Sequence, residues 1–355
     1  MGLDDPVSCL SVALERGRTR LAYLGVLGCA ALAAALGGCS SAGGTAKAVT
    51  TSEHSLTIAQ ARQAFNFYVT SSTLAAEQGS SAKGLAIVAD GQWSITHAQY
   101  ATLNSTGTPV PQYRYGTPAF YVPAQSGYPQ WFVVGVPAVS TSGTPDGSTV
   151  NTVMAFQREA PDALWTLNGS AVLDQPLPDI ARDGDGYAIS VSTKDSSLLL
   201  PPNLVGATQA AVVDEGPAAP AAAAIASGPQ TTGLYATQAA LNSSYTGQGL
   251  SYQWLLEGAA VPQFDLRTAD GGALVIYTMY LNTTIEHPGN VFGPPIPIPA
   301  NFAPIATATT GTKGNHGVAA NWTFEFATVD PPATAHGAKA VVIAAAGAPT
   351  YGHGY

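Results

Sequence analysis

The chain has 355 residues, of which 22 are acidic and 13 are basic, and charged residues make up only 10% of it. A net charge of −9 argues against a nucleic-acid-binding protein, which needs basic patches, and against electrostatic attachment to anionic lipid. The length is sufficient to bury one or two hydrophobic cores.

The first 38 residues have the pattern of a secretory signal peptide. Three arginines between positions 16 and 20 precede an uncharged apolar run at 21–36, and small residues come just before Cys39. This order of basic, apolar and small-residue regions is typical of an exported protein. The apolar run is shorter than the roughly 20 residues that span a bilayer. Removal of residues 1–38 would also remove Cys9 and Cys29, so we expect no disulfide.

Cys39 directly follows Leu36-Gly37-Gly38, and this junction resembles the lipobox of bacterial lipoproteins. In that family the cysteine thiol receives a diacylglyceryl group before cleavage. Two acyl chains matter because one chain gives only marginal membrane binding. The resemblance implies a protein that is lipid-anchored on the outer, extracytoplasmic face of the cell membrane. An ordinary signal peptide with an unmodified cysteine, or an uncleaved signal anchor, stays open as an alternative.

The segment after Cys39 changes from a tether to helices. Residues 39–55 are rich in Ser, Ala, Gly and Thr, which predicts a flexible tether. Apolar residues then recur at helical spacing, which predicts an amphipathic helix at 56–78. A second helical stretch is expected at 82–104, with an interruption at Asp90-Gly91.

From Val110 the pattern is one of short strands separated by glycine and proline. Strands are expected within 113–121, 131–134, 150–159 and 164–167. The following segment, 174–217, is interpreted as a long connection that contains one strand, Tyr187–Ser192. The first half is thus predicted as two helices followed by a curved antiparallel sheet.

The second half repeats this order of elements. Helices are expected at 217–227 and 233–246, and strands at 273–286, 319–329 and 339–346. Aromatic residues at alternate positions 322, 324 and 326 indicate a half-buried strand. Val110-Pro111-Gln112-Tyr113 reappears as Val261-Pro262-Gln263-Phe264, at an offset of 151 residues. A proline-rich loop of about thirty residues at 288–317 is either functional or an exposed insertion.

These patterns predict an α+β protein with two tandem domains, each a pair of helices with a curved antiparallel sheet. The expected limits are 1–38 for the signal peptide, 39–55 for the tether, 56–215 for the first domain with its connecting segment, and 216–355 for the second. Two helices followed by a bent sheet that ends in an aromatic strand resemble the cone of the nuclear-transport-factor-2-like fold.

The chain also resembles uncharacterised actinobacterial lipoproteins built around a domain of unknown function. The resemblance covers most of 56–192 and, more loosely, the second half, and it implies no activity. The matching stretches are Ala61–Tyr68, Ala119–Pro123, Trp131-Phe132, Leu164–Leu167, Leu177–Asp179 and Asp185–Ala188.

Motifs for catalysis and metal binding are incomplete. Ser80-Ser81-Ala82-Lys83 has the Ser-x-x-Lys spacing of penicillin-binding enzymes, but their partner motifs are missing. Asp179, Asp183 and Asp185 precede Gly186 without the spacing of a calcium loop, so a turn is expected. No histidine lies three or four residues from another, although His287, His316 and His336 could converge in space. We expect no metal site, no catalytic residue and no cofactor.

The aromatic residues of the first half are candidates for a ligand pocket, because a cone often encloses one beneath its sheet. Ordinary core packing is the competing interpretation. The candidate pocket residues are Tyr113, Tyr115, Phe120, Tyr121, Trp131, Phe156 and Trp165.

Three functions remain open at this point. The leading hypothesis is a membrane-anchored, non-enzymatic binding or interaction module for a cell-envelope protein, glycan or lipid. The alternative is a cone-fold enzyme that acts on a small apolar ligand, for which Asp90, His97 and Tyr113 would be the residues to test. A structural role in the envelope is the third.

Overall fold

The structure is a computed structural model that describes residues 11–12, 56–142, 148–289, 291–306 and 313–355. Apart from Ser11 and Val12, the expected signal peptide lies outside the described residues, and so does the tether with Cys39. In the part of the chain that is described, no helix is both long and apolar enough to cross a membrane.

The helices and strands of the first half occur in the expected order. The helices are α1 (Ile58–Glu77), α2 (Ser81–Leu85) and α3 (Asp90–Thr106). The strands are β2 (Tyr113–Tyr115), β3 (Ala119–Tyr121), β4 (Gln130–Ser140), β5 (Thr149–Arg158) and β6 (Thr166–Leu173), while the short β1 (Ser11–Val12) pairs with the last strand of the chain.

Local sequence explains where these helices begin and end. Thr57 and Gln60 cap the start of α1 reciprocally, and Gly107 ends α3 in the left-handed region with a φ of 75°. The interruption expected at Asp90-Gly91 lies instead at 86–89. There the chain pairs with β6, because the Ala89 N–H donates to the Leu167 carbonyl and the Leu167 N–H donates to the Ile87 carbonyl.

The second half contains elements that the sequence patterns did not indicate. α4 (Pro202–Glu215) occupies the segment predicted to be a connection. The helix starts with proline, which suits the first helical turn because a backbone N–H at that position would have no partner within the helix. β7 (Ser251–Gly258) and β8 (Phe264–Arg267) are also new. The expected elements are α5 (Leu234–Gly247), β9 (Ala273–Glu286), β12 (Gly317–Asp330) and β13 (Val341–Gly354).

Two of the predicted elements are wrong. Residues 217–227 contain only a single helical turn, Pro220–Ala223, because Gly216, Pro217 and Pro220 break the segment. Tyr187–Ser192 makes isolated bridges to Pro123, Arg182 and Leu266 rather than a strand. The remaining short elements are the turns Pro229–Gly233 and Ala303–Ile305 and the strands β10 (Ile296–Pro297) and β11 (Lys313–Gly314).

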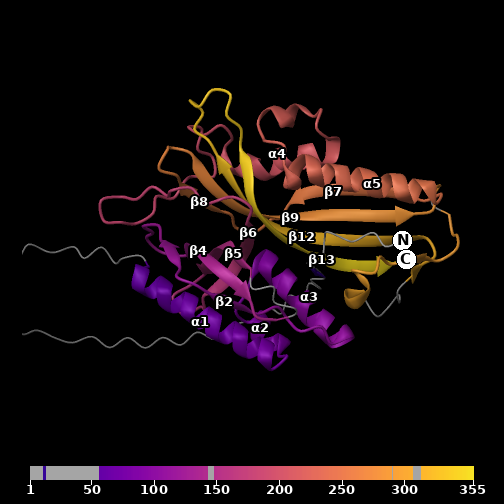
Figure 1. The fold of residues 1–355 in the computed structure, drawn as a ribbon, viewed down its shortest axis with the longest axis horizontal. Coiled ribbons are helices and arrows are strands. Elements are labelled where there is room, and N and C mark those ends of the chain that lie inside the picture. The colour runs from indigo at the N-terminus through magenta and orange to yellow at the C-terminus, as the bar shows by residue number, and fades with distance from the viewer. Residues whose placement is uncertain (1–10, 13–55, 143–147, 290, 307–312) are drawn as a thin grey trace, which may run out of the picture.

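Strand pairing follows the same order in both halves. The main sheet runs β2-β4-β5-β6-β13-β12-β9-β7, with β3 also on β4 and β8 also on β9. In each half the first short strand pairs with the C-terminal end of the long strand, and the second pairs nearer to its N-terminal end. Figure 1 shows α1–α3 and α4–α5 on opposite sides of the molecule, with the strands between them.

A β-bulge recurs at the same place in each half. Between β5 and β6 the register shifts after Ala155, so that Asn168 is skipped. Between β12 and β13 it shifts after Ala327, so that Ile343 is skipped. A bulge bends and twists its strand, and each half therefore curves at the corresponding strand pair.

The two halves join at β6 and β13. The junction consists of the antiparallel pairs Val172↔Ala345 and Leu173↔Ala344. The four-residue sequence match aligns β2 with β8, whereas the pairing order places β8 opposite β3. The domain limits expected at 56–215 and 216–355 stay a prediction.

Hydrophobic cores lie on both faces of the sheet. One cluster packs α1 against the first half through Phe65, Phe132 and Phe156, and the last two rings stack with centroids 4.9 Å apart. A second cluster combines side chains of both halves, such as Val153 and Leu274. The halves therefore share part of their core as well as the β6–β13 pairs.

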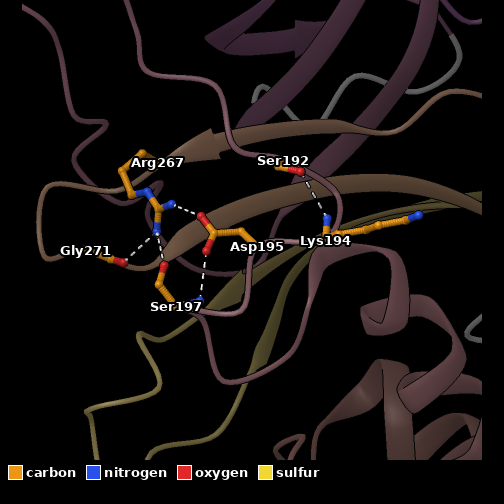
Figure 2. A network of polar contacts seen from close by, with 6 residues as sticks. All are labelled: Ser192, Lys194, Asp195, Ser197, Arg267 and Gly271. Atoms are coloured by element: carbon orange, nitrogen blue, oxygen red, sulfur yellow. Dashed lines mark hydrogen bonds and ion pairs between the residues drawn. The ribbon is translucent and has the colours of Figure 1, made fainter.

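The segment between β6 and α4 is attached to β8 by a polar network (Figure 2). The guanidinium of Arg267 on β8 forms an ion pair with Asp195, and it also donates to the Gly271 carbonyl at 3.0 Å. The other oxygen of Asp195 accepts from the backbone N–H of Ser197 at 2.8 Å. Hydrogen bonds from Ser197 and the nearby Arg267 lower the pKa of Asp195, so the carboxylate stays ionised.

We expect Arg267→Ala to loosen this segment without unfolding the protein. Both charged groups are partly exposed, and such pairs contribute no more than about 1 kcal/mol. Amide hydrogen exchange should therefore accelerate at Ser197 while the core strands stay protected. Lys194→Ala is the matched control, because Figure 2 shows its side chain directed away from Arg267. Equal exchange at Ser197 in both variants would contradict the role of the network.

Candidate functional site

The main pocket lies between the first-half helices and the sheet. Its volume of about 580 Å³ falls within the usual size of small-molecule sites. α1, α3 and the loop at 108–112 form one wall, and β2, β6 and β13 form much of the other. The wall includes residues of the second half, among them Phe324 and Ala345–Ala348, so the pocket reaches the junction of β6 and β13.

The lining is uncharged. No Asp, Glu, Lys, Arg or His occurs among the described residues that line the pocket, and the exposed lining is mainly apolar. The polar groups are hydroxyls and amides, contributed by Tyr68, Ser72, Thr73, Gln92, Thr96, Gln99, Tyr100, Thr102, Thr108, Gln112, Tyr113, Tyr115, Thr152, Ser170 and Gln230. A cavity of this kind suits an uncharged ligand, because a buried charge would have no counter-charge.

Three tyrosines of the pocket lining have hydroxyls without a hydrogen-bond partner among the described residues. They are Tyr68, Tyr100 and Tyr115, of which Tyr100 is buried. Tyr68 and Tyr115 line the pocket and are partly exposed, and neither of their hydroxyl oxygens is among the fully buried side-chain atoms that lack a hydrogen-bond partner. Burial, followed by the neighbouring Tyr115 and Tyr113, raises the pKa of Tyr68 well above its ordinary value. These phenols therefore stay protonated and can donate.

The start of α3 positions a second polar group beside the pocket. Asp90 has a φ of 51°, which Asp tolerates better than most residues, and its carboxylate accepts from the Asn168 amide at 2.6 Å. Gly91 follows, and a Cβ there would lie 2.6 Å from Thr278 and 2.8 Å from Glu325. A glycine is therefore required for α3 to approach the sheet this closely.

Glu325 lies at this contact between the halves. It is 1% exposed, and its Oε2 accepts a hydrogen bond from the backbone N–H of Ser170 on β6, whereas its Oε1 has no partner among the described residues. Burial raises the pKa of Glu325 to about 8, the Asp90 carboxylate adds to the rise, and the Ser170 N–H opposes it. The side chain therefore carries a proton at neutral pH and connects β12 to β6.

Two further buried carboxyls lie away from the pocket lining. Burial raises the pKa of Asp265 to about 7, although the Gln263 amide donates to it, and raises the pKa of Asp330 to about 6. The Asp330 carboxylate accepts from the Leu200 N–H at 3.2 Å and so attaches the segment before α4 to β12. These groups bear on folding stability rather than on the site.

The structure separates the aromatic residues that the sequence suggested for a pocket. Tyr113 and Tyr115 line the main pocket, and both also border a second hollow of about 510 Å³. Phe120, Phe156 and Trp165 pack in the core under α1. Tyr121 and Trp131 pack against the cluster shared by both halves.

Other candidates from the sequence lie in ordinary surroundings. The Lys83 ammonium donates to the Gln78 side chain, and Asp183 caps a turn by accepting from the N–H groups of Asp185 and Tyr187. His97 stacks on Trp93, and burial lowers its pKa. The backbone N–H of His287 donates to the His316 carbonyl, and no cluster of potential metal ligands occurs in the described ranges.

Sequence patterns did not indicate the α3 side chains or Glu325 as site residues. Gln92, Thr96 and Tyr100 are spaced along α3, and this repeat could have been noticed once the helix was assigned. Glu325 is the one charged residue of the predicted strand 319–329, whose aromatic pattern indicates a half-buried strand. That interpretation is wrong, because β12 is a central strand with almost all of residues 323–330 buried on both faces.

Comparison with known proteins gives a family and two relatives. The profile of a family described as a domain of unknown function (DUF8094) matches residues 52–352. An uncharacterized lipoprotein of Streptomyces avermitilis is 30% identical over 166 residues, and one of Streptomyces coelicolor is 26% identical over 163. Each match covers 45% of this chain and 45% of the relative, so the chain spans less than half the length of these curated proteins. No solved structure matches the chain.

Proposed function

The chain belongs to the DUF8094 family, a domain of unknown function, and on that premise we propose that it is a lipid-anchored, extracytoplasmic binding protein of the cell envelope. In this proposal Cys39 carries the acyl anchor on the outer face of the membrane. The lipobox-like junction at Leu36–Cys39 supports it, as do the two matched relatives, both named uncharacterized lipoproteins.

The binding site in this proposal is the pocket beneath α1 and α3. The observation that carries it is a cavity of about 580 Å³ whose described lining is mainly apolar and wholly uncharged. Such a site takes a small, uncharged and largely apolar molecule, since desolvating an ion there would have no compensation. We also propose that each half is a cone of the nuclear-transport-factor-2-like type, which the shared strand order and the recurrent bulge support.

We expect Ser72→Trp to abolish ligand retention. Ser72 lines the pocket from α1, and its hydroxyl donates only to the Val69 carbonyl of the same helix, so an indole would fill the cavity with little loss of packing. Full-length protein is purified from its membrane, and co-purifying small molecules are extracted and identified by mass spectrometry. An uncharged compound should accompany the wild-type protein and be absent from the variant.

Thr70→Trp is the matched control, because Thr70 is exposed on the same helix and lies outside the pocket lining. It should retain the compound at the wild-type level. An identical extract from wild type and Ser72→Trp would contradict binding at this site, and an extract enriched in charged compounds would contradict the neutral ligand.

A further inference from the structure

We infer that the pocket selects a ligand with a carbonyl-type acceptor, which the Tyr68 hydroxyl binds with support from Tyr115. This inference rests on the proposed function, because it names the chemistry of the molecule held in the same pocket. The remaining ligand surface would be uncharged and apolar, as the lining requires.

Tyr68 is held in place by the aromatic core under α1. Its ring packs edge-on against Phe156, with centroids 5.4 Å apart, so the core fixes its direction. The partly buried ring packs against the hydrophobic cluster under α1, and the residue also lines the cavity. A side chain with one edge in the core and accessible surface in the pocket presents its hydroxyl to the pocket.

The Tyr68 hydroxyl has no hydrogen-bond partner among the described residues. Buried hydroxyls in proteins are nearly always hydrogen-bonded, and those that are not call for an explanation. Two buried tyrosines elsewhere in the chain follow the rule, because Tyr277 bonds to Gln209 and Tyr252 bonds to Gln238, each at 2.6 Å. Among the described residues, Tyr68, Tyr100 and Tyr115 line one cavity and have no such partner, and Tyr68 and Tyr115 are the two that are partly exposed.

The Tyr68 and Tyr115 hydroxyls would act as donors toward a ligand. Both phenols keep their protons, because burial raises the pKa of each hydroxyl above its ordinary value. They therefore act as donors in a cavity whose described lining has no cation. A neutral acceptor such as a ketone, ester or quinone oxygen satisfies such donors, whereas a carboxylate would remain an unbalanced buried charge.

The test compares two probes of nearly equal shape, 2-acetylnaphthalene and 2-ethylnaphthalene, of which only the first carries a carbonyl. Binding to the full-length acylated protein in lipid nanodiscs is measured by equilibrium dialysis, and nanodiscs with the Ser72→Trp variant give the background due to lipid. Tyr68→Phe should weaken binding of the ketone about ten-fold and leave binding of the hydrocarbon unchanged or tighter. Tyr115→Phe should act in the same direction.

A stability measurement separates ligand recognition from a structural role. A hydroxyl without a protein partner contributes nothing to folding, so Tyr68→Phe should leave the melting temperature of the ligand-free protein unchanged or raise it. Tyr121→Phe is the matched control, because Tyr121 packs in the cluster shared by both halves and should affect neither probe.

Each outcome is decisive. Equal changes for ketone and hydrocarbon, or no change for either, would overturn the carbonyl assignment while the pocket itself still binds. A lower melting temperature for Tyr68→Phe together with unchanged ketone binding would assign the hydroxyl to folding. Failure of both probes to bind wild type above the Ser72→Trp background would overturn the proposed binding site and this inference together.

Discussion

The wild-type protein is expected to lose stability as the pH rises from about 5 to about 8, and the substitution Glu325→Gln is expected to reduce this loss. The carboxyl is 1% exposed, and burial raises its pKa in the folded protein from 4.5 to about 8. Between these two values the folded chain holds a proton that the unfolded chain has released. Stability therefore decreases as the pH rises through this interval, and it becomes constant above the folded pKa.

The size of the effect follows from the linkage between protonation and folding. One group with this shift lowers the free energy of unfolding by about 1.4 kcal/mol per pH unit, or about 4–5 kcal/mol over the interval. That is a large share of the roughly 5–15 kcal/mol of a typical domain. Glutamine carries no titrating proton, and its side-chain oxygen can still accept the hydrogen bond from Ser170.

Urea unfolding from pH 4.5 to pH 9 measures this prediction. A shallower slope should remain in Glu325→Gln, because Asp265 and Asp330 have raised pKa values of about 7 and about 6 and act with the same sign. Glu77→Gln, at an exposed position of α1, is the control and should follow the wild type. Parallel curves for wild type and Glu325→Gln would show that this carboxyl does not hold its proton in the folded state.

Replacing Cys39 with serine is expected to abolish acylation and, because acylation precedes cleavage in the lipobox family, to leave residues 1–38 attached to nearly all of the protein. A hydroxyl cannot take the place of the thiol that receives the diacylglyceryl group in the lipobox family. The mature sequence has few charged residues, mostly acidic, so the two acyl chains are its expected attachment to the membrane. The expected loss of acylated protein that begins at Cys39 is therefore close to complete.

Fractionation with alkaline extraction, followed by intact-mass measurement, tests this change. Wild type should be membrane-bound, begin at Cys39 and carry the mass of its acyl chains, and Cys29→Ser within the apolar run should behave in the same way. If the wild type itself stays in the membrane with residues 1–38 attached, the segment is an uncleaved anchor. If wild type is released without acyl mass, the alternative of an ordinary signal peptide is correct.

The parts of the fold that could be predicted are those governed by neighbours along the chain. The helical spacing of apolar residues places α1 within two residues of its observed limits, Ile58–Glu77. The strand predicted at 273–286 coincides with β9 (Ala273–Glu286), and the strand predicted at 319–329 falls within β12 (Gly317–Asp330). Both signals are local, because periodicity reports which face of an element is apolar.

The elements that were missed depend on distant contacts. α4 has no strong apolar stripe, and it is held by side chains far along the chain, such as the bond from Tyr277 on β9 to Gln209. β7 is an edge strand whose partner, β9, supplies its register. Such elements cannot be assigned from local periodicity, because their stability comes from tertiary partners.

The sequence by itself determined the α+β class and most element positions of this protein, and it indicated an exported chain with an anchoring cysteine, because composition, periodicity and a short junction motif act locally. Only the tertiary structure decided that the two sets of strands meet at β6 and β13 and that Tyr68, Tyr115 and the α3 side chains surround one pocket. It also buried Glu325 between the halves. Which surfaces face one another depends on contacts between residues more than a hundred positions apart, and no local pattern encodes those contacts.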